Sequence, residues 1–241
     1  MGDLDGVWIK IARAREHMEE SSELIESFRN SRPYTFSSEF DAQTGDQVWK
    51  VDSDPFQPPS WPVIGDILYN FRSALDHLAW QLVLKANGAP DRGTEFPIFN
   101  DPDLWKRDSP RDMRSMNGAM KDMLKSEQPC FGPNPHRNKL LWGLQEYGNI
   151  DKHRLPLIVA CSSAGMFWSP TGPSLFVHEG PVQKDTILAR FPASYPKDEI
   201  STVVDVAFGE PPAFGDSLQF TFIGIEMNVT RIVERFQTAF F

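Results

Sequence analysis

The first thirty residues carry apolar or small side chains at alternating steps of three and four. The positions are Leu4, Val7, Ile11, Ala14, Met18, Ser21, Ile25 and Phe28. This spacing predicts one amphipathic helix from about Leu4 to Phe28, whose Glu and Arg residues face solvent. Pro33 ends the helix. Residues 34–40 and 47–51 then flank a turn that contains Gly45, which predicts a β-hairpin.

The rest of the chain shows the same two kinds of hydrophobic pattern, one with helical spacing and one typical of strands. Helical patterns cover about 63–86, 111–125, 135–155 and 225–240, and strand-like patterns fill 155–208. Asn87 and Gly88 supply the end of the second helix. We therefore predict a single α+β domain, 1–241. Its core is a helical bundle of about five helices (4–30, 63–87, 111–154 and 225–240), with an N-terminal β-hairpin and a small antiparallel sheet in a β-rich insertion, 155–210, before the last helix.

Composition narrows the class of protein. The chain has 241 residues, 40% of them hydrophobic and 24% charged, as in soluble globular proteins. It has no apolar run of about 18 residues, so we expect no membrane span. The start is acidic and lacks a hydrophobic signal region. Only two cysteines occur, Cys130 and Cys161, and neither lies in a CxxC motif. Together these features favour the reducing cytoplasm.

The distribution of charge is uneven. The net charge of −9 argues against broad, sequence-independent binding of nucleic acid. Residues 106–154 nevertheless hold ten Lys or Arg against six Asp or Glu. This basic stretch permits an anionic ligand, and a solvated helix surface is the alternative interpretation.

The second predicted helix carries a polar cluster, Arg72, Asp76 and His77, among large apolar residues. Asp76 is the i+4 neighbour of Arg72 and can hold its guanidinium. Arg72 and His77 lie about 140° apart around the helix axis, so they converge only through the long Arg side chain or across a subunit interface. The helix is apolar or aromatic on most sides, as in a bundle centre or an oligomer interface. We therefore expect a homodimer.

A second polar cluster, Asn149-Ile-Asp-Lys-His-Arg154, ends the helix that begins at Pro135. Asp151 lies on the same stripe as Leu144 and Tyr147, and an acid on an apolar face must be paired or protonated. We predict that the two helices pack side by side and bring Asp151 to Arg72 or His77. The cations that follow Asp151 lie at the C-terminal end of the helix, where positive charge is favoured by the helix dipole. This effect is the alternative, purely structural interpretation of the cluster.

Two resemblances follow from these motifs. Arg72, Ser73 and His77 resemble the Arg-x4–6-His signature of the HEPN superfamily, the higher eukaryotes and prokaryotes nucleotide-binding domains. The Asn-Phe-Arg-Ser-Ala-Leu-Asp-His segment at 70–77, together with Asn-Ile-Asp-Lys-His-Arg, resembles a widespread group of uncharacterised bacterial proteins that pair the two motifs over roughly residues 60–160 and the last helix.

The HEPN resemblance implies a metal-independent ribonuclease of a defence or toxin system that acts at a dimer interface. His77 would move the proton of a ribose 2′-hydroxyl, and Arg72 would stabilise charge on phosphorus. The predicted partner is then RNA, with no cofactor and no metal. The predicted catalytic residues are Arg72, Asp76, His77 and Asp151. The predicted substrate-binding residues are Asn70, Asn149, Lys152, His153 and Arg154.

Two other functions fit the same residues. In a non-catalytic binding or assembly protein, Arg72 and Asp76 form a simple ion pair and His77 is a core imidazole bonded to Asp151. In a DinB-like metal-binding bundle, His77, His153 and one acid are ligands, although the chain lacks the His-x3-His spacing that strengthens such an assignment.

Overall fold

The computed structural model describes residues 3–31, 34–52, 58, 61–169, 172–177, 182–194 and 201–241. The chain divides into two compact units. The helical unit contains residues 1–21, 61–156 and 219–241, and the sheet unit contains residues 22–60 and 157–218. The expectation of a single domain stays a prediction. The α+β class, with an N-terminal hairpin and further strands before the last helix, is confirmed.

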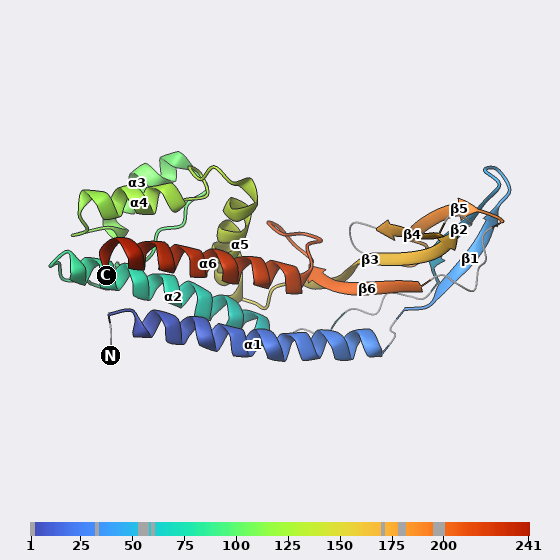
Figure 1. The fold of residues 1–241 in the computed structure, drawn as a ribbon, viewed down its shortest axis with the longest axis horizontal. Coiled ribbons are helices and arrows are strands. Elements are labelled where there is room, and N and C mark those ends of the chain that lie inside the picture. The colour runs from blue at the N-terminus through green and yellow to red at the C-terminus, as the bar shows by residue number, and fades with distance from the viewer. Residues whose placement is uncertain are drawn as a thin grey trace. The chain divides into compact units, whose positions relative to one another are not determined.

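The described residues form six helices (Figure 1). They are α1 (Asp5–Asn30), α2 (Val63–Lys85), α3 (Pro102–Asp112), α4 (Gly118–Glu127), α5 (Pro135–Asp151) and α6 (Leu218–Phe240). None of the described helices is both long and apolar enough to cross a membrane. The apolar residues of α2 at 64, 67, 68, 71, 75, 78 and 82 are almost fully buried, so this face of α2 lies in the core of the helical unit. On the opposite face Tyr69, Trp80 and Leu84 are exposed, so α2 is not buried on all sides.

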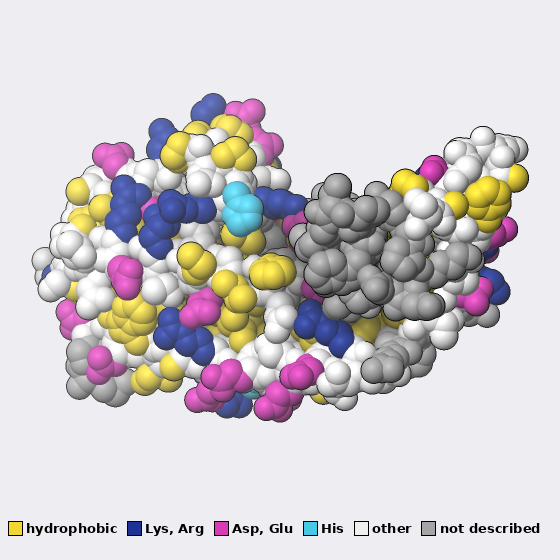
Figure 2. All heavy atoms as spheres, turned by 45° about the vertical axis from the view of Figure 1, so that its right-hand side comes forward, with side chains coloured by type: hydrophobic (Ala, Val, Ile, Leu, Met, Phe, Trp, Pro, Cys, Tyr) yellow, Lys and Arg dark blue, Asp and Glu magenta, His cyan; other side chains and the backbone are white. Residues whose placement is uncertain are grey.

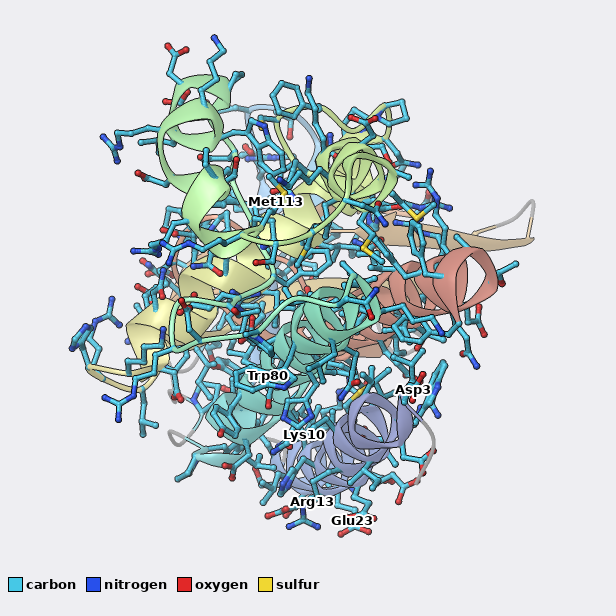
Figure 3. The ribbon with its side chains drawn as sticks, turned by 90° about the vertical axis from the view of Figure 1, so that its left-hand side faces the viewer. Asp3, Lys10, Arg13, Glu23, Trp80 and Met113 are labelled. Carbon is cyan, nitrogen blue, oxygen red and sulfur yellow. The ribbon has the colours of Figure 1, made fainter. Side chains whose placement is uncertain are left out.

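α1 packs along α2 in the opposite direction. The ring of His77 lies over Gly6, and the ammonium of Lys10 lies 3.5 Å from Oδ1 of Asn70 and 5.1 Å from the centre of the Tyr69 ring. Figure 3 views the helical unit end-on, with Lys10 between α1 and α2 and Arg13 on the outer face of α1. The absence of a side chain at Gly6 is what allows the imidazole to lie against the backbone of α1.

The predicted continuous helix over 111–125 is wrong. Two shorter helices occupy this part of the chain, and Ser115 between them has a positive φ of 68° that a helix cannot continue through. Each short helix has its own N-cap. The side chain of Asp101 accepts the backbone N–H of Asp103 at 2.7 Å, and that of Asn117 accepts the N–H of Met120 at 3.0 Å.

Among the described residues the sheet unit holds two three-stranded antiparallel sheets, one that contains the predicted hairpin and one formed by strands that precede the last helix. Their strands are β1 (Phe36–Asp41), β2 (Asp46–Val51), β3 (Ile158–Ser169), β4 (Gly172–Val177), β5 (Ile187–Pro192) and β6 (Ser201–Phe208). The orders are β1-β2-β5 and β4-β3-β6, so the predicted hairpin gains a third strand from late in the sequence. Inside this unit Trp49 donates to Thr202 at 2.8 Å, and Arg29 pairs with Asp205.

α5 lies directly on the first turns of α2. A Cβ built on Gly65 would meet Oδ1 of Asp151 at 2.3 Å, so the carboxyl group of α5 occupies the place where any other residue would carry a side chain. Gly148 on α5 has open space around it. Packing therefore requires glycine at position 65 but not at position 148, so the two helical glycines can be compared directly.

We expect Gly65→Ala to lower the free energy of unfolding by about 1–3 kcal/mol, as overpacking of a tight contact does, although alanine favours helix more than glycine. Gly148→Ala should instead raise it by about 0.5–1 kcal/mol because only the helix preference changes. Urea unfolding of both variants measures the difference. A stabilising effect of Gly65→Ala similar to that of Gly148→Ala would contradict this packing of α2 against α5.

Candidate functional site

A pocket of about 70 Å³ lies between α2 and α5, and we call it the α2–α5 pocket. Tyr69 and Arg72 line it from α2, and Gln145, Gly148, Asn149, Asp151 and Lys152 line it from α5 and its end. The predicted side-by-side packing of the two helices is confirmed. The pocket therefore joins one residue of the first motif to three of the second.

Arg72 lines this pocket with a largely buried side chain, which is 17% exposed. Its Nη2 lies 3.1 Å from Oδ1 of Asp76 and 3.7 Å from Oε2 of Glu95. The predicted i,i+4 ion pair between Arg72 and Asp76 is confirmed, and Glu95 is a partner that the sequence did not indicate. The other terminal nitrogen, Nη1, is buried and has no hydrogen-bond partner.

Gln145 provides the complementary group. Its Oε1 is also buried without a hydrogen-bond partner. In the described part of the chain seven buried side-chain nitrogen or oxygen atoms have no partner, and two of them, one a donor and the other an acceptor, belong to residues that line this one small pocket. Leaving a buried polar group unpaired costs about 1–3 kcal/mol, so the pair points to a ligand or ordered water that satisfies both atoms.

Asp151 lies in the pocket wall without a direct bond to either predicted partner. The sequence predicts Asp151 within hydrogen-bonding or one-water reach of Arg72 or His77. Among the described residues its carboxylate has no direct hydrogen bond or ion pair with either side chain, so direct pairing is wrong, and contact through one water stays a prediction. Asp76 and Glu95 hold the Arg72 guanidinium, whereas Asp151 rests on Gly65, seven residues or about 10 Å nearer the start of α2. Burial, with the nearby charge of Asp66, raises the pKa of Asp151 above its usual range.

His77 faces a second pocket, of about 370 Å³, that also includes Asp76, Trp80, Gln81 and Thr94. Its imidazole is exposed and lies over Gly6, so the interpretation of His77 as a core imidazole bonded to Asp151 is wrong. Trp80 projects from α2 on this side (Figure 3). Arg72 and His77 thus line different pockets within one chain, as their separation around the helix axis predicts.

Asp76 connects the two pockets and also holds a loop. Its Oδ1 accepts the backbone N–H of Phe96 at 3.0 Å. Burial raises the pKa of Asp76, and the charge of Arg72 opposes that effect. Gln128, which is fully buried, holds the same loop by accepting the N–H of Phe99 at 3.0 Å and donating to the carbonyl of Pro97 at 2.8 Å. The Arg72–Asp76 pair therefore has a structural role whatever its chemistry.

The other predicted binding residues divide into two groups. Asn149 and Lys152 line the α2–α5 pocket, where the Lys152 ammonium donates to Oδ1 of Asn149 at 3.2 Å. Asn70 is buried on the side of α1, and its amide donates to the carbonyl of Asp66 at 2.8 Å. His153 and Arg154 lie exposed beyond the end of α5, outside the residues that line either pocket.

Sequence reasoning missed three residues of the pocket wall. These are Tyr69, Gln145 and Gly148. Gln145 and Gly148 lie seven and four residues before the predicted Lys152 on one helix stripe, so the pattern was present beside the apolar stripe of α5. Tyr69 was visible only as an aromatic residue on the less buried face of α2. Glu95 lies in a loop, and no periodic signal points to it.

Among the described residues, no group of three or more His, Cys, Asp or Glu side chains is arranged to hold a metal ion. His77 and His153 do not meet with an acid, so the DinB-like interpretation has no geometric support. The comparisons identify no family either, because no family model, no curated protein and no solved structure matches this chain. Function must therefore be inferred from the chemistry of these side chains.

We expect Asp151→Asn to raise the melting temperature at pH 7. The pKa of Asp151 is raised in the folded state, so folding favours the protonated form, and ionisation destabilises the fold as the pH rises through the interval between the unfolded and folded pKa values. The asparagine variant avoids this cost. The difference in melting temperature between the variant and wild type should therefore disappear near pH 3, about one unit below the ordinary pKa of an aspartate, because Asp151 is then protonated in both the folded and the unfolded state. A variant less stable than wild type at pH 7 would show that Asp151 has a charged partner.

Proposed function

We propose that the α2–α5 pocket binds a nucleotide, either free or as part of an RNA chain. The observation that carries this proposal is that two residues of one pocket wall, Arg72 and Gln145, hold an unpaired buried donor and an unpaired buried acceptor. Every nucleobase presents a hydrogen-bond acceptor next to a donor on its Watson–Crick edge, which proteins read when a base is unstacked. One base edge therefore satisfies both buried atoms at once.

The surroundings of the pocket suit the rest of a nucleotide. A volume of about 70 Å³ admits the edge of a base and leaves the ring, sugar and phosphate outside. At the rim Tyr69 is 62% exposed and offers an aromatic surface for stacking. Lys152 is exposed and supplies a cation for the phosphate. This recognition needs only one nucleotide, so it agrees with a chain whose net charge of −9 does not favour broad nucleic-acid binding.

The decisive variant is Gln145→Met, which keeps the length of the side chain and removes the unpaired acceptor. In buffer with saturating inorganic phosphate, which occupies any site that reads phosphate alone, we expect nucleoside 5′-monophosphates to bind the wild type and ribose 5-phosphate to bind much more weakly. Gln145→Met should weaken nucleotide binding by about tenfold, the equivalent of one hydrogen bond. The melting temperature of the free protein should not fall, because the lost acceptor had no partner. Isothermal titration calorimetry and thermal unfolding measure the two effects.

The matched control is Gln237→Met, at an exposed position on α6 outside the pocket, which should change neither property. Unchanged nucleotide binding by Gln145→Met would contradict the proposal. An equal loss of binding in Gln237→Met would also contradict it. A third contradicting result would be that none of the four common nucleoside 5′-monophosphates binds more tightly than a Kd of about 1 mM, which is a very weak affinity.

A ribonuclease of HEPN type is the second candidate function, and Asp76 is the observation that favours it. The same carboxylate is paired with Arg72 and lines the pocket of His77, beside the aromatic surface of Trp80. In that mechanism His77 accepts the proton of a ribose 2′-hydroxyl, whose oxygen attacks the neighbouring phosphorus, and Arg72 stabilises the added charge. The bond from phosphorus to the 5′-oxygen breaks, which leaves a 2′,3′-cyclic phosphate and a 5′-oxygen that takes up a proton to become a hydroxyl. Because Arg72 and His77 line different pockets, a homodimer in which they come from two chains would complete such a site.

RNA incubated with the protein in EDTA tests this candidate. We expect cleavage by wild type and a loss of at least about a hundredfold in both His77→Ala and Arg72→Ala, the usual effect of removing an acid–base group. Mixing the two inactive variants should restore part of the activity, since a mixed dimer holds one complete site. His136→Ala, at an exposed histidine on α5, is the control. Intact RNA, or cleavage that survives both substitutions, would remove this candidate and leave nucleotide binding untouched.

A further inference from the structure

A second polar cavity lies at the other end of α5, and we call it the arginine cavity. It measures about 130 Å³, several times the space that one water needs. The end of α4, the loop before α5, the first turn of α5 and the middle of α6 surround it. Arg137 in its wall and Asp151 in the α2–α5 pocket are fourteen residues apart on α5, which is about 21 Å along the helix. The two sites are therefore separate.

The charged residues in the wall are three arginines, Arg137, Arg231 and Arg235, and one acid, Glu127. By formal charge the cavity has a surplus of two positive charges. Figure 2 shows Lys and Arg side chains gathered on one face of the helical unit. A concave surface of one sign attracts ligands of the opposite sign.

Glu127 fixes two of these arginines in place. Its side chain is only 4% exposed, and it pairs with Arg231 and with Arg235. The two terminal nitrogens of Arg231 reach the two carboxylate oxygens in a bidentate pair. Burial acts to raise the pKa of Glu127, but the hydrogen bonds from both arginines outweigh burial and hold that pKa below its usual range. Glu127 therefore stays ionised, and one carboxylate orients two guanidinium groups.

Donors remain after this pairing. The Nε of Arg231 is buried and has no hydrogen-bond partner. Arg137 is exposed, and its side chain has no ion-pair partner among the described residues. Glu127 can neutralise only one of the two guanidinium groups that it holds. One buried unpaired donor and a surplus of two cations thus belong to residues that border one cavity. The unpaired donor is the costly feature, since the cations are at least partly exposed, and the surplus of positive charge favours an anion at this place.

The wall is also rigid where it meets the ligand space. Asn228 on α6 donates to the carbonyl of Arg137 at 3.2 Å and accepts from Arg231 at 3.0 Å, which ties α5 to α6. The side-chain amide of Asn138 donates to the carbonyl of Gly132 at 2.8 Å. A Cβ on Gly132 would clash with Oδ1 of the same Asn138 side chain. The loop and the helices are therefore held in place before any ligand binds, which lowers the ordering cost of binding.

We propose that the arginine cavity binds a phosphate group. Guanidinium groups recognise tetrahedral oxyanions by pairs of parallel N–H···O bonds, and three of them around a volume of this size match one phosphate. The group can be inorganic phosphate or the terminal phosphate of a larger molecule. These sources share their chemistry at the cavity, so the ligands used in the test must separate them.

Calorimetry of the full chain with inorganic phosphate, pyrophosphate and ribose 5-phosphate, in chloride buffer of low ionic strength, tests the proposal. We expect phosphate to bind, and Arg137→Gln to weaken binding at least about tenfold, as the loss of one charge-assisted contact does. Arg137 is exposed, so this variant should fold normally. Arg235→Gln removes a second cation, and its retained fold is checked by thermal unfolding. Tighter binding of pyrophosphate or ribose 5-phosphate than of inorganic phosphate would identify a terminal phosphate group as the ligand.

The control is Arg107→Gln, at an exposed arginine on α3 that is paired with Asp108 and lies outside the cavity. It should bind phosphate as wild type does. An equal loss in Arg107→Gln would show unspecific attraction, and unchanged binding in both Arg137→Gln and Arg235→Gln would place phosphate elsewhere. The proposal would also be overturned if phosphate bound only with a Kd above about 1 mM or did not bind at all. Gln145→Met should leave phosphate binding intact, which separates this site from the α2–α5 pocket.

Discussion

The close contact between Asp151 and Gly65 sets the geometry on which the candidate site depends. Because Gly65 has no side chain, the end of α5 approaches the backbone of α2, and the carboxyl group fills the space. That approach places the polar stripe of α5 opposite Tyr69 and Arg72 and forms the small pocket between them. A larger residue at position 65 would separate the helices, and the unpaired donor and acceptor would no longer share one space.

Arg72, Asp76 and His77 are neighbours in the sequence of α2, but the structure gives them different roles. Asp76 and Glu95 hold Arg72, and Asp76 also holds the loop at Phe96, so the first motif organises the helical unit. A group fixed in this way can present its remaining nitrogen to a ligand without the entropy cost of ordering a free arginine. Structural and binding roles are therefore compatible in Arg72, whereas His77 is exposed on another side and contributes nothing to the α2–α5 pocket.

Much of this could be predicted from periodicity, and the errors have physical causes. The apolar pattern of α2 and the position of Asp151 on the stripe of α5 were sufficient to predict that these helices pack together. The partner of Arg72 was not predictable in the same way. Arg72 is drawn toward Glu95 in a loop whose position depends on the buried Gln128, a contact far from both in sequence. The division into α3 and α4 depends on side-chain caps at Asp101 and Asn117, which local periodicity does not reveal.

The central claim is that the two motifs form one binding site, with Arg72 and Gln145 facing a ligand. Two-dimensional NMR of the labelled protein during titration with a nucleoside 5′-monophosphate tests it most directly. The side-chain amide of Gln145 and the backbone amides near Tyr69, Arg72 and Lys152 should shift together and saturate with one affinity. Shifts that appear only around His77 and Trp80, or that spread over the surface without saturation, would contradict the claim.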